Sequence, residues 1–219
     1  MSFKQLINQN FTAIGVVTLG TLLSSVLLAL RIKVFQDFFL LFLGWNLILA
    51  LTPFVIALAT YKYVEALARP FIRIPIFLIW LLFLPNAPYL LTDFIHLRLS
   101  AATTVVFDFV LILSFSVTGC MAGVYAIGIM KQFLNLFYNP LQVKALVLIF
   151  SLLCGYGVYL GRVLRLNSWD VFTRPGTTIP KLLSGLQDPL AWLMTIGCGI
   201  LIFFGQRCLM AKKEVLPHS

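Results

Sequence analysis

Charged side chains are scarce in this sequence of 219 residues. Only 11% of the residues are Asp, Glu, Lys or Arg and 61% are hydrophobic, whereas about a quarter of an ordinary soluble domain is charged. A soluble fold of this size would leave large apolar patches facing water, which soluble monomers avoid. The composition therefore excludes a soluble domain and indicates that lipid covers much of the surface.

Among the charged residues, acidic ones are the scarcer: the sequence has 7 acidic and 16 basic residues and a formal net charge of +9. A nucleic-acid-binding protein can have this balance, but here the basic residues stand in short gaps between apolar runs instead of covering one face. That placement is typical of residues that set membrane topology and contact headgroups. We predict the lipid bilayer as a partner, with an anionic lipid or solute as a further one, and no nucleic acid.

Familiar catalytic and metal-binding motifs are absent as well. The sequence contains no GxSxG, HExxH, P-loop or GxGxxG motif, so it names no reaction class. The 4 cysteines have neither CxxC nor Cys/His ligand spacing, and three of them lie inside apolar runs beside glycines. We interpret them as small packing residues.

Long apolar runs dominate what remains. A helix of about 20 apolar residues crosses the hydrocarbon core of a bilayer, and such runs cover residues 11–30, 38–60, 74–92, 105–130, 145–161 and 189–206. We therefore predict an all-α polytopic bundle of about six transmembrane helices that forms one integral membrane domain over residues 1–219. A short helix over residues 179–186, capped by Thr178, is predicted to lie on the membrane.

An even number of spans places both termini on one side, which allows the charges to be sorted by face. The face with the termini carries nine Lys and Arg and the opposite face seven, which favours cytoplasmic termini in the inner (plasma) membrane. The opposite, extracytoplasmic face collects five of the 7 acidic residues and the non-terminal histidine: Asp37, Asp93, Asp108, Asp170, Asp188 and His96. The predicted bundle is thus polarised.

The end of the third run is the most informative segment. Pro85 and Pro88 remove backbone donors and must kink or restart the helix, and a restart near Pro88 puts Tyr89, Asp93 and His96 on one helical face. Asp93 and His96 are candidate catalytic residues for proton transfer, or for a divalent metal if further ligands join them. The alternative is an interfacial Asp and His that bond locally.

Asn86 lies within the apolar run and needs a partner. We consider it and Tyr89 as candidate substrate-binding residues, and the alternative for Asn86 is a cap on the restarted helix. Asp108, one turn inside the fourth run, is a further candidate because an unpaired charge there is costly. Arg162 or Arg165 is its predicted partner, in an ion pair that is either structural or part of a site.

The segment after the fifth run adds basic groups to the same face. Arg162 and Arg165 are predicted to share a helix face, where two guanidinium groups can grip a phosphate or carboxylate, with Asn167 and Asp170 as further substrate-binding candidates. The alternative is a pair of arginines that extend to the interface. Two glycine pairs, Gly119/Gly123 and Gly157/Gly161, are predicted to serve close helix packing.

At these segments the chain resembles a known family. The runs LPNAPYLLTDFIHL at 84–97 and YLGRVLRLNSWD at 159–170 are similar to the bacterial multi-pass membrane proteins grouped as domain-of-unknown-function family 1361. The resemblance implies a bacterial membrane protein and transfers no catalytic role to any residue.

Two functional hypotheses follow. In the first, the chain is a membrane enzyme that acts on a lipid or an amphiphilic headgroup, with the arginines holding the anion and Asp93 and His96 transferring protons or binding a metal. In the second, the chain is a small transporter or a membrane partner subunit that uses the same polar cluster as a solute or ion site. Because every polar candidate lies near one interface, the sequence favours the first.

Overall fold

The computed structural model describes residues 3–214 of the chain, and all of their regular secondary structure is helical. The elements are α1 (Phe3–Phe35), α2 (Phe42–Lys62), α3 (Val64–Leu67), α4 (Pro70–Phe83), α5 (Asn86–Tyr89), the 3-10 helix η1 (Leu90–Leu99), α6 (Val105–Leu134), α7 (Pro140–Arg162), α8 (Asp170–Thr173), α9 (Pro175–Gly185) and α10 (Pro189–Glu214). The all-α prediction is confirmed.

Within the described residues, six helical segments are long and apolar enough to cross a membrane. They are Asn10–Phe35, Phe42–Thr60, Pro70–Leu99, Val105–Leu134, Pro140–Arg162 and Pro189–Cys208. The number and order of the predicted spans are confirmed, which indicates a multi-pass membrane protein. The third span is longer than predicted because the chain stays helical on both sides of its prolines, as α4, α5 and η1.

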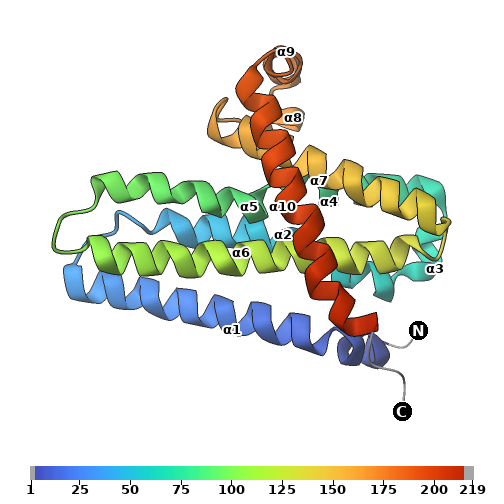
Figure 1. The fold of residues 1–219 in the computed structure, drawn as a ribbon, viewed down its shortest axis with the longest axis horizontal. Helices are drawn as coiled ribbons and strands as arrows, with labels where there is room; N and C mark the ends of the chain where they lie inside the picture. The colour runs from blue at the N-terminus through green and yellow to red at the C-terminus, as the bar shows by residue number, and fades with distance from the viewer. Residues whose placement is uncertain (1–2, 215–219) are drawn as a thin grey trace.

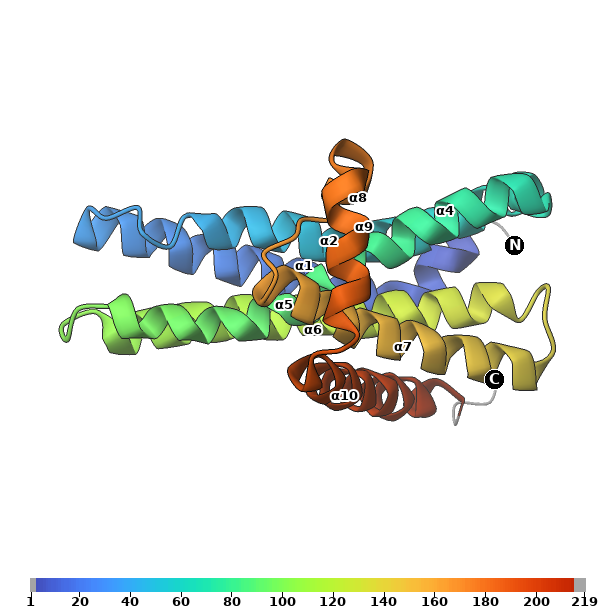
Figure 2. The ribbon, with the colours of Figure 1, turned by 90° about the horizontal axis from the view of Figure 1, so that it is seen from above.

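The helices α1, α2 and α6 run alongside the α4–α5–η1 span as a layered bundle (Figure 1). The helix α10 crosses this bundle steeply and packs mainly against α7, while α8 and α9 project from one side (Figures 1 and 2). The beginning of α1 and the end of α10 lie toward the same end of the bundle, the end that also holds the turn between α6 and α7 (Figure 1). This arrangement agrees with an even number of spans.

The core is almost wholly apolar and has two parts. One gathers aromatic and aliphatic side chains of α2, α4, α6 and α7 around Trp80 and Phe133. The other packs α2, α5 and α6 around Leu43, Leu90 and Phe115. The broken third span contributes to both clusters, with Trp80 and Leu84 in the first and Ala87 and Leu90 in the second.

The helix after the fifth span differs from the prediction. The structure begins α9 at Pro175 rather than at residue 179, with a proline in its first turn. The Thr178 hydroxyl donates to the Asp170 carbonyl at 3.1 Å and does not cap a helix. Its Ile179, Leu183 and the following Leu186 are exposed. These side chains give this helix an exposed apolar face.

Candidate functional site

The prolines break the third span at a defined place. α4 ends at Phe83 and α5 begins at Asn86, two residues before the predicted restart. The carbonyl groups at the end of α4 find side-chain donors: the Ser168 hydroxyl donates to the Leu82 oxygen at 3.0 Å, and the Asn86 amide donates to the Phe83 oxygen at 2.9 Å. Asn86 also donates to the Ser168 hydroxyl at 3.3 Å, so it satisfies the end of α4 rather than capping α5.

Both predicted glycine pairs face this break, and the packing role assigned to them is confirmed. A Cβ atom added to Gly123 of α6 would lie 2.6 Å from the Ala87 Cβ, and one added to Gly119 would lie 2.9 Å from the Ala87 carbonyl oxygen. On α7, a Cβ at Gly157 would lie 2.7 Å from the Pro85 Cβ. Only glycine allows α6 and α7 to approach the broken segment so closely.

Beyond the break, η1 continues as a 3-10 helix of 10 residues. This helix has three residues per turn, so residues three apart lie directly above one another. Asp93 and His96 therefore share one side of η1. Asp93 is only 1% exposed, which makes it a buried carboxylate, whereas His96 is half-buried.

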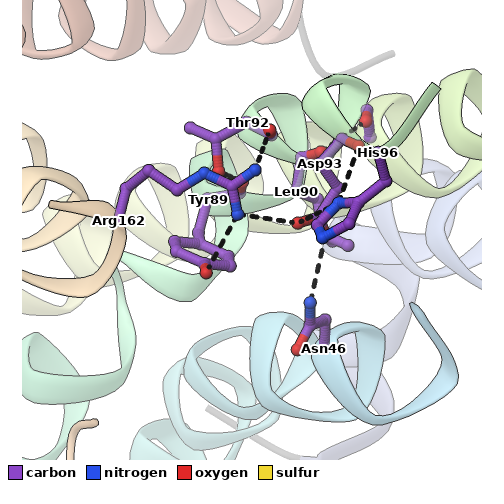
Figure 3. A network of polar contacts seen from close by, with 8 residues as sticks. Asn46, Tyr89, Leu90, Thr92, Asp93, His96 and Arg162 are labelled. Carbon is purple, nitrogen blue, oxygen red and sulfur yellow. Dashed lines mark hydrogen bonds and ion pairs between the residues drawn. The ribbon is translucent and has the colours of Figure 1, made fainter. Parts of the chain in front are cut away.

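Asp93 is held by three side chains from three elements (Figure 3). Its Oδ2 accepts from the Asn46 amide of α2 at 3.1 Å, and its Oδ1 lies 3.5 Å from Nη1 of Arg162 on α7. The Nδ1 of His96 lies 3.8 Å from the same Oδ1 and 3.0 Å from the Asp93 carbonyl oxygen. A buried carboxylate with these partners is satisfied, and removing one partner would leave an uncompensated charge.

Arg162 is fully engaged inside this cluster. Its Nη2 donates to the Thr92 carbonyl oxygen at 2.5 Å, its Nη1 donates to the Tyr89 hydroxyl at 3.3 Å, and its guanidinium carbon lies 5.6 Å from the centre of the Tyr89 ring. Figure 3 shows the side chain reaching from α7 across Tyr89 to Asp93. Arg162 thus ties α7 to the broken span.

Arg165 has a different environment. The helix α7 ends at Arg162, and Arg165 adopts a left-handed backbone conformation with φ 53°. The prediction that the two arginines share a helix face was therefore wrong, because the chain turns between them. Arg165 is exposed and, among the described residues, its side chain has no hydrogen-bond or ion-pair partner.

Both arginines nevertheless line one large cleft with a volume of about 1060 Å³. Its polar lining consists of Asn46, Asn86, Tyr89, His96, Tyr156, Arg162, Arg165, Asn167, Ser168 and Thr178. Its apolar walls come from α2, α4, α7 and α9, through Leu49, Leu78, Leu81, Leu153, Leu160 and Leu182 among others. Trp45 and Trp169 also line it, and both are exposed. The cleft is therefore amphipathic.

Two of the predicted residues form a turn. The Asp170 carboxylate accepts from the Asn167 backbone N–H at 2.7 Å and from its side-chain amide at 3.4 Å. Asn167 lines the cleft, but Asp170 does not. The geometry thus gives Asp170 a local structural role and leaves Asn167 beside the cleft.

Asp108 belongs to another cluster, and its predicted partner was wrong. Asp108 is fully buried and its Oδ1 accepts from Nε of Arg31, which is 2% exposed, at 3.1 Å. Arg31 is available because it lies near the end of α1 and contacts the start of α6, whereas the predicted arginines lie at or after the end of α7. The Thr104 hydroxyl donates to Oδ2 of Asp108 at 3.2 Å, which completes a structural ion pair.

Arg31 also binds the loop that follows α1. Its Nη1 lies 2.8 Å from Oδ2 of Asp37. The pKa of Asp37 is lowered, first because the Phe39 backbone N–H donates to the carboxylate at 2.9 Å and then because Arg31 pairs with it. This cluster ties the end of α1, the loop after it and the start of α6 together, and its charged residues do not line the cleft.

The metal hypothesis lacks a complete ligand set. Within residues 3–214, no three His, Cys, Asp or Glu side chains gather closely enough to hold an ion. Asp93 and His96 remain a pair, and the other Asp93 neighbours are an amide and a guanidinium. Asn46, Ser168 and Trp45 are among the cleft residues that we did not predict as site residues. The signal for Asn46 was its position as a polar residue within an apolar run.

Comparison with known proteins gives a family. The chain belongs to DUF1361, described as "Protein of unknown function", which it matches over residues 45–204. The match includes the broken third span, both glycine pairs and the whole cleft lining, but not α1 with Arg31. No curated protein and no solved structure matches the chain.

Proposed function

We propose that this DUF1361 member binds an anionic membrane lipid, with the headgroup at the polar end of the cleft and a chain along its apolar walls. The observation that carries the proposal is the amphipathic lining, which combines an unpaired arginine with leucine-rich walls in one cavity. At about 1060 Å³ the cleft is slightly larger than the usual range for small-molecule sites, which ends at about 1,000 Å³. A free inorganic anion would leave most of this volume unfilled.

The length of the apolar part agrees with a lipid chain. Along α7 it extends from Arg162 to Leu153, and nine residues of helix rise by about 14 Å. One leaflet contributes roughly 15 Å of hydrocarbon. Leu78, Leu153 and Leu183 line the cleft and are exposed, which leaves a side open for a chain to enter from the bilayer.

The polar end offers one uncommitted cation. Arg162 already donates to Tyr89, Thr92 and Asp93, whereas Arg165 does not share its charge with any described residue. A phosphate oxygen beside Arg165 would gain charge-assisted hydrogen bonds. Asn167 and Asn46 supply further amide groups in the lining.

We further propose the inner (plasma) membrane of a bacterium as the location, with cytoplasmic termini and an extracytoplasmic cleft. The excess of basic residues on the face with the termini supports this orientation. The exposed Trp45, Trp169 and Trp192 are the residue type that collects at the interface. A Gly176→Cys variant without native cysteines should be labelled by an impermeant maleimide from outside intact cells. Labelling only after permeabilisation would reverse the orientation.

The binding test compares two arginines. The protein is placed in nanodiscs of phosphatidylcholine with graded amounts of phosphatidylglycerol, and tryptophan fluorescence with native mass spectrometry reports bound lipid. Arg165→Gln should weaken phosphatidylglycerol binding about 10-fold or more, because a hydrogen bond to a charged group contributes about 1.5–3 kcal/mol. Arg174→Gln is the matched control, since Arg174 is exposed and does not line the cleft. Equal binding by both variants would refute the headgroup assignment.

A second pair of variants tests the position of the lipid's hydrocarbon chain. Leu153→Trp should obstruct the apolar end of the cleft and reduce binding of long-chain phosphatidylglycerol, while binding of a dihexanoyl analogue is retained. Leu148→Trp is the control, because Leu148 is similarly exposed on α7 but does not line the cleft. If inorganic phosphate competes as well as the lipid does, the site binds a free anion and the lipid proposal fails.

A solute or ion site in a small transporter remains the second candidate. Its supporting observation is the buried Asp93 carboxylate on an interrupted span, since interrupted helices often form transport sites. Flux through vesicles that contain the protein, lost in Asp93→Asn but unchanged in Arg165→Gln, would favour it over lipid binding.

A further inference from the structure

We infer that the bound lipid is also a substrate, and that His96 is the general base that activates a hydroxyl nucleophile against an ester bond at its headgroup end. This inference rests on the proposed lipid site. It goes beyond that site because it assigns chemistry to one nitrogen atom of one side chain.

The hydrogen bonds of His96 determine which nitrogen carries its proton. Nδ1 lies 3.0 Å from the Asp93 carbonyl oxygen and 3.8 Å from the Asp93 carboxylate, and both of these groups only accept. Nδ1 must therefore be the donor. In the neutral imidazole the other nitrogen, Nε2, then has a free lone pair, which is the requirement for a general base.

The imidazole ring is held in position from several sides. Its centroid lies 4.7 Å from that of Phe42 and 6.3 Å from that of Phe39. Asp93 in turn is fixed by Asn46 and Arg162, as Figure 3 shows. Asp93 is buried and does not line the cleft, so it is a positioning residue for His96 and not itself the base.

The composition of the cleft lining leaves His96 as the base. Among the described residues, the lining contains no Asp, Glu, Lys or Cys. Its other ionisable groups are two tyrosines and two arginines, and neither residue type ordinarily exchanges protons near neutral pH. Histidine is the residue type that does so.

The reaction balances without an oxidant, reductant or metal. A hydroxyl group, from water or from a second lipid, transfers its proton to Nε2 of His96 while its oxygen bonds to the phosphorus or acyl carbon of the ester. The ester bond to the leaving oxygen breaks, and that oxygen takes the proton back from Nε2. Arg165 and Asn167 are the lining groups that can stabilise the negative charge that develops.

The test uses an isosteric pair. His96→Asn places an amide donor near the position of Nδ1 and lacks Nε2, whereas His96→Gln places its amide nearer to Nε2. The protein in nanodiscs is incubated with phosphatidylglycerol, cardiolipin, phosphatidic acid or a total bacterial lipid extract, and products are identified by mass spectrometry. We expect product from the unmodified chain, and about 100-fold or more slower formation in both variants, with phosphatidylglycerol binding retained in His96→Asn.

A second measurement concerns the tautomer itself. Nitrogen-15 NMR of histidine-labelled protein should show a neutral His96 protonated on Nδ1, and modification of Nε2 by diethylpyrocarbonate should slow when phosphatidylglycerol is bound. A neutral ring protonated on Nε2 would overturn the inference. Lipid binding without any product, or equal rates in His96→Asn and the unmodified chain, would also overturn the assignment of His96 as a base but not the lipid site. Absence of lipid binding would refute both the lipid site and the role of His96.

Discussion

The glycine at position 157 offers the most direct test of how the broken span is held. A Cβ added there would lie 2.7 Å from the Cβ of Pro85, about 0.7 Å short of the 3.4 Å at which ordinary contact begins. Because both atoms are attached directly to backbone, rotation of a side chain cannot relieve the overlap. α7 and the break must therefore separate in the Gly157→Ala variant, and overpacking of this kind costs about 1–3 kcal/mol.

The matched control is Gly197→Ala on α10, where an added Cβ would meet no atom within 4 Å. Alanine is the better helix former by up to about 1 kcal/mol in water, so this variant should be as stable as the unmodified chain or slightly more so. Unfolding in mixed micelles of increasing denaturing detergent measures both variants. If Gly157→Ala is as stable as Gly197→Ala, the close packing around Pro85 is not what holds the break.

The separation of α7 from the break in the Gly157→Ala variant should also change the geometry of the cleft. Arg162 lies five residues after Gly157 on α7 and donates to the Thr92 carbonyl on the opposite side of the contact. Separation of the two elements would lengthen that hydrogen bond and weaken the support of Asp93. Gly157→Ala should therefore also lower the affinity for phosphatidylglycerol, although the substitution adds no charge and removes no polar group.

Three further predictions concern charged groups. Arg162→Met should destabilise the fold by about 3–5 kcal/mol, because Asp93 is left buried without its cation. Adding Asp93→Leu to this variant should recover part of the lost stability in the same unfolding assay. If the double variant recovers no stability, the pairing of Arg162 with Asp93 is contradicted. Because the folded-state pKa of Asp37 is lowered, the stability that it contributes should be complete above its ordinary pKa of about 3.8 and lost as pH falls through the lower folded value. Melting curves of Asp37→Asn and the unmodified chain should accordingly differ at pH 6 and converge near pH 2. Arg165→Gly should retain full thermal stability, since glycine adopts φ 53° freely, but should lose phosphatidylglycerol binding; a lower melting temperature with intact binding would assign Arg165 a structural role instead.

The sequence was sufficient for features that depend on local composition and spacing. Apolar runs locate the spans because bilayer thickness fixes helix length, and Pro85 and Pro88 locate the break because they lack backbone donors. The spacing of the glycines identified both pairs, but it did not identify the surface that they contact. Nothing in the sequence shows that both pairs, on two different helices, pack on the one broken segment.

Pairing between distant residues was the part that sequence reasoning could not supply. Asp108 was assigned to the arginines after the fifth span because all of them lie on one predicted face. The structure pairs it with Arg31, a residue 77 positions away, because α1 and α6 are in contact along their lengths. Which face a charge occupies follows from counting spans, whereas its partner depends on how the helices pack. The separation of Arg162 from Arg165 by the end of α7 is a similar case, since no motif marks that helix end.

The contacts of η1 with two side chains explain how a carboxylate is buried here. A backbone carbonyl has two lone pairs, and in η1 the Thr92 carbonyl accepts from Arg162 and the Asp93 carbonyl accepts from His96. The same two residues contact the Asp93 carboxylate. Each cationic or imidazole side chain is therefore held at two points, one on the backbone and one on Asp93. Because two-point attachment fixes orientation better than a single contact, the cleft has a rigid polar end, and rigidity of that kind is what discrimination between headgroups requires.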